Sequence, residues 1–286
     1  MHLEEIGKSI SFRLRNIALS RFEQDSAYKN IISPFSRLYL ITEGNGYLVF
    51  DGVKIILEPN HLYLIPGFTP CSYFFGKNLV HIYIHFSMEM PSGLSIYNLF
   101  KVLPKIQASM NDPALFHKCL ALNPGFELPH DDPRVYQAKP WINKEISYSS
   151  LAHYLETTAV IAQLFSRFVK EELTGNINKI ANPNFQNVLK FIQENIHQEI
   201  SVRELAAMSF TSKDHFARIF KSITGMPPSE YVIQKRLEKA KLLLLTTNDS
   251  LSEIIAQTGF RTTAYFCRMF KKHTLLTPEQ FRKNRG

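Results

Sequence analysis

The strongest constraint on the fold is an internal repeat, in which residues 251–282 reproduce the pattern of residues 201–231 fifty positions later. Each copy predicts a short amphipathic helix, a break, and a second helix whose apolar residues recur at spacings of three and four. The sequence therefore predicts two helix-turn-helix units in tandem. The residues that match between the copies are Ala206 and Ala256, Phe210 and Phe260, Phe216 and Phe266, Arg218 and Arg268, Phe220 and Phe270, Lys221 and Lys271, Thr224 and Thr274, Pro228 and Pro278, and Tyr231 and Phe281.

The second helix of each copy carries polar side chains on the face opposite its phenylalanines. Short hydrogen-bonding side chains beside an arginine suit base edges and phosphates in a major groove. Both helices are therefore predicted to be recognition helices. The face holds Ser212, Lys213, Asp214, His215, Ala217 and Arg218 in the first copy, and Arg261, Thr262, Thr263, Ala264, Tyr265, Cys267 and Arg268 in the second.

The turn of the second copy contains Gly259, followed by Phe260 as an apolar anchor. Glycine adopts the left-handed backbone that a sharp reversal after a helix often needs. Ser209 stands at the same place in the first copy, where we expect a costlier turn. Between the copies, residues 229–245 form one long helical pattern. Such a stiff helix is expected to hold the two recognition helices about one DNA turn apart, roughly 34 Å.

The repeat region resembles the DNA-binding domain of the AraC/XylS family of bacterial transcription regulators. The resemblance is carried by Ala256, Gly259-Phe260, Tyr265-Phe266, Phe270-Lys271-Lys272, Thr277-Pro278 and Phe281-Arg282, with Arg236-Leu237, Ala240 and Leu243-Leu244 in the long helix. It implies a transcription regulator without catalytic activity, with duplex DNA as its partner and RNA polymerase as a further candidate partner. One departure from the family pattern is Leu275, where a glycine is usual; Gly225 keeps that glycine in the first copy.

The same resemblance implies roles for the polar residues of the two recognition helices. The residues onto which it carries base contacts are Asp214, Ala217 and Arg218 in the first copy, and Thr263, Ala264, Cys267 and Arg268 in the second. Lysines are better phosphate contacts, because a flexible ammonium is a point charge rather than a two-pronged reader of a base. The remaining members of the predicted DNA-binding set are Lys213, Lys221, Lys271, Lys272, Ser212 and Thr262. The alternative for the two arginines is that they pair with Glu204 or Glu253 and only brace the fold.

The positive charge of the chain is concentrated in the part that holds the repeat. The net charge of the whole chain is +8, and residues 175–286 contain 17 Lys and Arg against 9 Asp and Glu, which accounts for all of it. A basic part joined to a neutral part fits a polyanion-binding module joined to a module with another kind of partner. A basic, merely solvated face is the alternative.

Residues 35–86 change to the short period of β-strands. Asp51-Gly52 between two apolar runs is a signal for a two-residue hairpin, and many short strands at this spacing predict a sandwich or a barrel. The stretch around Gly44, Gly46, Glu58-Pro59 and Ile65-Pro66 also resembles the cupin-type barrel in which AraC-family regulators sense effectors. The expected strands cover residues 37–42, 46–50, 53–57, 61–65 and 79–86.

A closed barrel of this size can enclose one small ligand, so aromatic and polar residues of these strands are candidates for binding a small-molecule effector. The candidates are Tyr39, Tyr47, Tyr63, Cys71, His81, Tyr83 and His85. The alternative for each ring is that it only fills the core. His81 and His85 face one side of a single strand, and no histidine near Gly44 supplies a second pair. We therefore expect no metal ligands and no cofactor.

Residues 147–173 form the longest helical pattern of the N-terminal part. Its apolar surface, which includes Leu151, Leu155, Ile161 and Phe165, is wide enough to face both the barrel and a partner subunit. Similar regulators dimerise through helices in this region, so a homodimer is expected, and packing wholly within one chain is the alternative. A short amphipathic helix is also expected near residues 96–106. Trp141, the one tryptophan of the sequence, is interpreted as a packing anchor.

The predicted architecture is an N-terminal all-β cupin-like barrel with accessory helices, followed by a C-terminal all-α tandem helix-turn-helix domain. The expected bounds are 1–174 for effector sensing and dimerisation, 175–184 for a polar linker and 185–286 for DNA binding. Long apolar runs and a signal-peptide pattern are absent, and the three cysteines are widely spaced, so we expect a cytoplasmic protein without membrane contact. Two other interpretations stay open: a cupin-type metal enzyme with a DNA-binding tail, and a regulator whose ligand-free barrel only dimerises.

Overall fold

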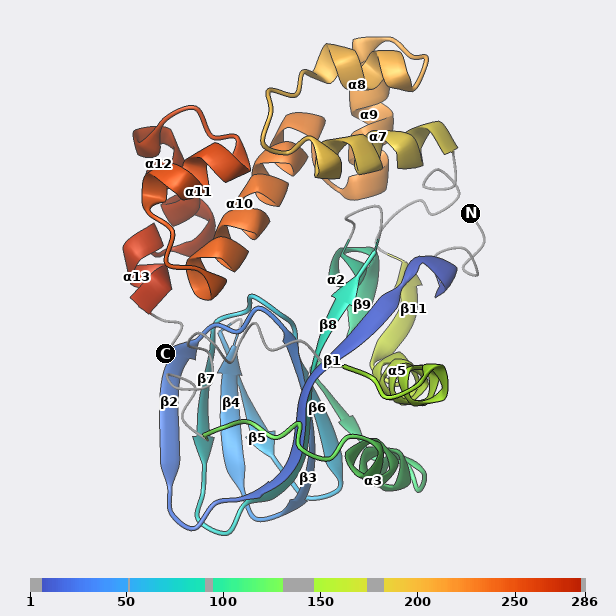
Figure 1. Cartoon of the computed structure of the whole chain (residues 1–286), viewed down its shortest axis with the longest axis vertical. Helices are drawn as coiled ribbons and strands as arrows, with labels where there is room; N and C mark the ends of the chain where they lie inside the picture. Colours follow the sequence, from blue (N-terminus) through green and yellow to red (C-terminus); the bar gives the residue numbers. More distant parts are fainter. Residues whose placement is uncertain (1–6, 51, 91–94, 131–146, 174–182, 284–286) are drawn as a thin grey trace. The chain divides into compact units, whose positions relative to one another are not determined.

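The computed structural model of the chain describes all residues except 1–6, 51, 91–94, 131–146, 174–182 and 284–286 (Figure 1). The chain divides into two compact units. Phe12–Met88 and Val102–Val169 form the first, called the β unit below. Glu89–Lys101 and Lys170–Arg282, with the N-terminal residues up to Ser11, form the second, called the helical unit.

Two antiparallel sheets make up most of the β unit. The five-stranded sheet has the order β1 (Ser11–Arg21), β8 (Val80–Glu89), β3 (Ser36–Glu43), β6 (His61–Ile65), β10 (Lys105–Gln107). The four-stranded sheet has the order β2 (Ser26–Ile31), β7 (Cys71–Phe75), β4 (Gly46–Phe50), β5 (Val53–Leu57).

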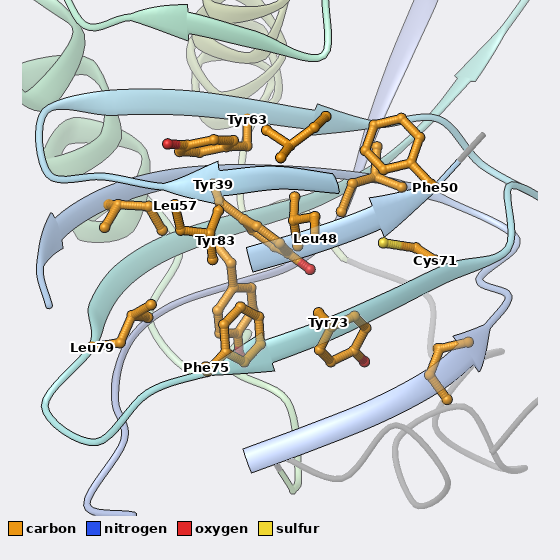
Figure 2. Close-up of a cluster of buried hydrophobic side chains, with 14 of the residues drawn as sticks. Tyr39, Leu48, Phe50, Leu57, Tyr63, Cys71, Tyr73, Phe75, Leu79 and Tyr83 are labelled. Carbon is orange, nitrogen blue, oxygen red and sulfur yellow. The ribbon is translucent and has the colours of Figure 1, made fainter. Parts of the chain in front are cut away.

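Alternate residues of both sheets point into one shared core, because successive side chains of a strand face opposite sides. In β4, Leu48 and Phe50 are buried in this core, whereas Tyr47 and Val49 are half-exposed on the other face. Figure 2 shows the core side chains, which come from strands of both sheets. The core residues are Phe22, Ile31, Tyr39, Ile41, Leu48, Phe50, Ile55, Leu57, Tyr63, Ile65, Cys71, Tyr73, Phe75, Leu79 and Tyr83.

The five strands expected from the sequence are confirmed as β3, β4, β5, β6 and β8, and the hairpin is confirmed by the pairing of Phe50 with Val53. Asp51 itself lies outside the described residues. Strands β1, β2 and β7 and helix α3 (Asp112–Leu122) had no prediction.

The expected helix over 96–106 is wrong beyond Leu99, where α2 (Ile96–Leu99) ends and β9 (Phe100–Val102) begins. Pro104 cannot continue a helix, because it lacks the amide hydrogen and its ring clashes with the preceding turn.

Helix α5 (Leu151–Ser166) begins at the N-cap Ser150, whose side chain accepts a hydrogen bond from the His153 amide. One face is buried through Val160, Ile161, Leu164 and Phe165. The expected helix is therefore too long at its C-terminal end, since residues 169–173 form β11, which pairs with β9. The predicted anchor Trp141 lies outside the described residues.

The helical unit contains the helices of the repeat, the helix that precedes them and the long helix between the two copies. They are α7 (Pro183–Glu194), α8 (Val202–Met208), α9 (Lys213–Thr224), α10 (Pro228–Thr246), α11 (Leu251–Thr258), α12 (Thr263–Thr274) and α13 (Pro278–Lys283). The two predicted helix pairs are thus confirmed as α8–α9 and α11–α12, joined by α10. Of the expected linker over 175–184, residues up to 182 lie outside the described part. In the described residues, no helix combines the length and the apolar character needed to cross a membrane.

Candidate nucleic-acid interface

The two recognition helices, α9 and α12, are built in the same way. Ser212 and Thr262 are their N-caps, and each hydroxyl oxygen accepts a hydrogen bond from the backbone amide three residues later. Two phenylalanines of each helix are completely buried, Phe216 and Phe220 in α9 and Phe266 and Phe270 in α12. Burying these rings leaves the opposite face of each helix in solvent.

The predicted DNA-binding residues all lie on these two solvent-facing surfaces. Ala217 and Cys267 are half-buried, and the other eleven are exposed: Ser212, Lys213, Asp214, Arg218, Lys221, Thr262, Thr263, Ala264, Arg268, Lys271 and Lys272. Because the equivalent DNA-binding positions of α9 and α12 share their exposure, both helices present a polar face to solvent. Such a face can enter a major groove with its N-terminal residues at the bases.

Neither recognition arginine forms an ion pair within the described part of the chain. Arg218 Nη2 lies 3.5 Å from His215 Nδ1, one turn earlier in α9. The Arg268 guanidinium lies 5.4 Å from the centre of the Tyr265 ring. Glu253, the alternative partner of Arg268, accepts a hydrogen bond from the Ser250 amide at 2.7 Å and completes a capping box at the start of α11. Both guanidinium groups therefore reach solvent.

The C-terminal ends of α9 and α12 also repeat each other. The Thr224 hydroxyl donates to the Phe220 carbonyl at 2.9 Å, and the Thr274 hydroxyl donates to the Phe270 carbonyl at 2.8 Å. Gly225 follows in the first copy with φ 79°, and Leu275 follows in the second with φ 62°. The turn before the last helix is thus kept although Leu275 replaces the usual glycine.

The turns inside the two helix pairs differ, which corrects the expected equivalence of Phe210 and Phe260. In the second pair Gly259 takes the left-handed backbone, with φ 74°, and Phe260 is only 5% exposed. In the first pair Ser209 keeps φ −94°, and Phe210 itself is left-handed with φ 54° and 86% exposed. The left-handed residue has moved by one position, so Phe210 is not an apolar anchor.

Six of the seven candidate effector-binding residues lie on the inward face of the β unit. Tyr63, Tyr39 and Tyr83 are cross-strand neighbours on β6, β3 and β8 (Figure 2). The Tyr39 ring stacks on His81, with centroids 5.1 Å apart, and the centroids of Tyr83 and His85 are 4.8 Å apart. Cys71 is buried in the same core.

Tyr47 does not join this group. It lies on the outer face of β4, where its ring stacks on Phe74 at 5.3 Å and Lys54 Nζ lies 4.0 Å from the ring centre. Tyr63, although inward, uses its hydroxyl within the fold: it donates to the Ile56 carbonyl at 2.9 Å and accepts from the Glu58 amide at 2.8 Å. These contacts tie β6 to the end of β5.

The two buried histidines are neutral at pH 7. Burial lowers the pKa of His81 to about 3, and burial, together with the positive charge of Arg37, holds the pKa of His85 well below its usual range. His81 is 4% exposed, and the described residues supply no hydrogen-bond partner for its Nδ1. In the described residues, no three His, Cys, Asp or Glu side chains are grouped as metal ligands.

Sequence reasoning missed Arg37, a fully buried cation of β3 that stands opposite His85 on β8. Its Nη2 donates to the Thr69 carbonyl at 3.4 Å. The signal was present in the strand pattern, because Arg37 precedes Tyr39 by two residues and alternation places both on the same face.

Comparison with known proteins adds to this picture. A family model described as a helix-turn-helix domain matches residues 205–284. The chain is 27% identical over 146 residues to SAS0078, described as an uncharacterized HTH-type transcriptional regulator, from Staphylococcus aureus strain MSSA476, covering 50% of this chain and 20% of that protein. It is 29% identical over 103 residues to LumQ, a probable transcriptional regulator of Photobacterium leiognathi, covering 36% and 42%. The chain therefore spans 20% and 42% of the lengths of these relatives.

Solved structures that match nearly the whole chain include the following one. It is a structure of ToxT from Vibrio cholerae, with a TM-score of 0.50 and 13% identity over 96% of this chain and 98% of that chain. At this identity the likeness concerns the fold, and it includes both the β unit and the helical unit.

Proposed function

We propose that residues 205–284, which match a helix-turn-helix family model, are a DNA-binding domain of the AraC type, and that the chain is a transcription regulator that binds a specific duplex DNA sequence through α9 and α12. The observation that carries the proposal is the shared polar face of the two recognition helices. The positive charge of this part of the chain supports it, since neutralised phosphates supply most of the affinity of such domains.

The roles within the interface follow from side-chain chemistry. Arg218 and Arg268 contact bases, because a guanidinium can donate two hydrogen bonds to the O6 and N7 acceptors of guanine. The nearby short side chains, such as Asp214 and Thr263, contact neighbouring base edges. The lysines of the two faces, Lys213, Lys221, Lys271 and Lys272, contact phosphates.

The test is selection of binding sites from a pool of random duplex DNA by the full-length chain. Selected DNA is expected to bind about a thousandfold more tightly than scrambled DNA of the same length at physiological salt. Both affinities should fall as salt rises, because phosphate contacts release counterions. Equal binding of selected and scrambled DNA would refute a sequence-specific regulator.

We further propose that the β unit is a cupin-like barrel that binds a small-molecule effector among Tyr39, His81, Tyr83 and His85. The support is the convergence of these rings and the buried Nδ1 of His81, for which the described residues supply no hydrogen-bond partner. A panel of sugars and metabolites should include compounds that raise the melting temperature. Tyr39→Phe should reduce that shift, whereas the matched outward variant Tyr47→Phe should keep it.

A metal-dependent enzyme and a ligand-free dimerisation barrel are the two rivals to this effector proposal. Metal analysis of the purified full-length protein distinguishes the first, since a cupin-type enzyme would contain a stoichiometric metal ion. A panel without any thermal shift favours the second. RNA polymerase is a proposed further partner, and the cytoplasm is the proposed location.

The proposed homodimer uses the exposed apolar face of α5. Leu151, Tyr154 and Leu155 are exposed at helical spacing. Exposing these apolar side chains to water does not stabilise a single chain, whereas a partner subunit could cover them. Leu155→Glu should give a folded monomer in sedimentation, whereas Glu156→Gln, on the adjacent position, should stay dimeric. Ile161 and Phe165 are unsuitable for this test because they are buried within the chain. A folded Leu155→Glu dimer would place the interface elsewhere.

A further inference from the structure

The short segment between α7 and α8 is fixed to the turn of the second helix-turn-helix unit. Arg236, in the middle of α10, donates from Nε to the Ile196 carbonyl at 3.1 Å and from Nη2 to the Gln198 carbonyl at 2.6 Å. Hydrogen bonds from a charged donor are stronger than neutral ones. One side chain thus holds two carbonyls of the short segment that precedes the first helix pair.

The turn of the second unit approaches the same segment backbone to backbone. A Cβ added to Gly259 would lie 2.5 Å from the Ile196 carbonyl oxygen. The Arg236 guanidinium lies 6.0 Å from the centre of the Phe260 ring, and Glu199 forms an ion pair with Arg261. The segment 196–199 is therefore hydrogen-bonded by Arg236, ion-paired to Arg261 and closely approached by Gly259, while the Phe260 ring lies beside the Arg236 guanidinium. These residues are called the clamp below.

The clamp closes a ring of contacts around the helical unit. Glu199 lies two residues before Ser201, the N-cap of α8, so holding the segment also holds the start of the first helix pair. Helix α8 packs on α9, α9 and α11 both pack on α10, and α11 leads into the clamped turn. Without the clamp, α10 would be the main connection between the two pairs, and each pair could pivot at its end of that helix.

We infer that Arg236 is a positioning residue that locks the two recognition helices in one relative orientation, so that the chain reads only DNA in which two half-sites have one fixed spacing. The inference rests on the proposed DNA-binding function. Adding one base pair between half-sites rotates one of them by roughly 35° about the duplex axis, since a turn holds 10–10.5 base pairs. A rigid pair of helices cannot follow this rotation, whereas a hinged pair can.

The experiment compares full-length variants on the duplex that the wild type selects from random DNA and on the same duplex with one base pair inserted or removed between the half-sites. On either changed duplex, the affinity of the wild type should fall at least about tenfold. This loss is similar to the cost of one mismatched base pair in a binding site. Arg236→Met should bind the unaltered site more weakly and lose less than about threefold on the changed spacings. Lys239→Met removes one charge from the same helix outside the clamp and should keep the wild-type penalty.

Arg236→Lys is the second variant in case Arg236→Met does not fold. It keeps the charge, but its single ammonium cannot bond both carbonyls in the fork geometry of a guanidinium. Relaxed spacing in a folded Arg236→Lys protein supports the inference. A wild type indifferent to spacing, or folded Arg236 variants that keep the full penalty, would overturn it. A wild type that selects no sequence at all would instead refute the proposed function.

Discussion

The two helix-turn-helix units share a skeleton and differ in where they place glycine. Each unit has two residues with left-handed backbone, one in the turn between its helices and one after its recognition helix. The first unit has Phe210 and Gly225 at these places, and the second has Gly259 and Leu275. Each unit therefore carries one glycine and one bulky residue, in opposite order.

The surroundings explain which of these positions requires glycine. Gly259 faces the carbonyl of Ile196 within contact distance, whereas a Cβ on Gly225 would meet nothing within 4 Å. Phe210 and Leu275 are 86% and 83% exposed, so their side chains have room although their backbones are strained. Close approach of another backbone, rather than the left-handed angle alone, is what excludes a side chain here.

Replacing Gly259 with alanine should have the largest effect on this comparison. We expect a loss of about 3 kcal/mol in the free energy of unfolding, because left-handed strain and a clash with the Ile196 carbonyl act together. Gly225→Ala, the matched control in open space, should lose about 1 kcal/mol. Denaturant unfolding followed by helical circular dichroism measures both. Equal losses in the two variants would show that the Ile196 carbonyl does not exclude a side chain at position 259.

The two recognition arginines give the next largest effect. Arg218→Ala and Arg268→Ala should each reduce discrimination at one base pair by about 2 kcal/mol, because each removes a two-pronged contact to guanine. The affected base pair should differ between the variants, since each helix reads its own half-site. Affinities for the selected site and for single-base changes measure this. Lys221→Ala, a phosphate contact, should instead weaken all sites alike and lower the salt slope.

The finding that would contradict base reading is a lower melting temperature with unchanged base preference. In that case the arginines would brace the fold. Their contacts favour base reading, because in the described part of the chain Arg218 approaches His215 and Arg268 approaches Tyr265, each one turn earlier on its own helix.

The third contrast concerns the starts of α8 and α11, where a serine N-cap is followed by a glutamate three residues on. Glu253 bonds back to the Ser250 amide, whereas Ser201 accepts from Glu204 without the same reciprocal box. Glu253→Ala should therefore cost about 1 kcal/mol more in the free energy of unfolding than Glu204→Ala, the value of one hydrogen bond. Thermal unfolding of the two variants tests it. Equal losses would mean that the carboxylate acts only through the helix dipole.

The repeat made most of the helical unit predictable. Its period identified the helix pairs, and the buried phenylalanines fixed which faces of α9 and α12 meet solvent. The long helix between them, α10, followed from the same apolar spacing. In the β unit, β-branched and aromatic runs located five strands, but β1 and β2 are edge strands with many exposed polar residues and gave too weak an alternation.

The contacts that hold these elements together were less accessible. The clamp uses the backbone carbonyls of Ile196 and Gln198, which have no side-chain signature, so only the conformation reveals it. The left-handed residue of the first pair, Phe210, comes one position later than its counterpart Gly259 in the second pair, and the sequence gives no signal for this shift. The inward position of Tyr39 and the outward position of Tyr47 needed the pairing of β3 and β4 with their neighbours.

Leu275→Gly tests the smallest difference between the units. Leu275 has φ 62°, and its amide donates to the Lys271 carbonyl at 2.8 Å, so the residue serves as the C-cap of α12 in a conformation that costs a leucine about 1–2 kcal/mol. Glycine removes that strain but adds freedom to the unfolded chain worth about 0.5–1 kcal/mol. Since the side chain is mostly in solvent, little burial is lost, and a net gain of about 0.5 kcal/mol is expected.

Leu275→Ala separates the backbone contribution from the side-chain contribution. It keeps a Cβ at the same left-handed angle, so it should leave the free energy of unfolding within about 0.5 kcal/mol of the wild type, as for an exposed surface site. A stabilised glycine variant beside an unchanged alanine variant would assign the difference between Leu275 and Gly225 to backbone strain alone. If both variants were destabilised to the same extent, the leucine side chain would have to make a stabilising contact, and the second unit would depend on it where the first needs only Gly225.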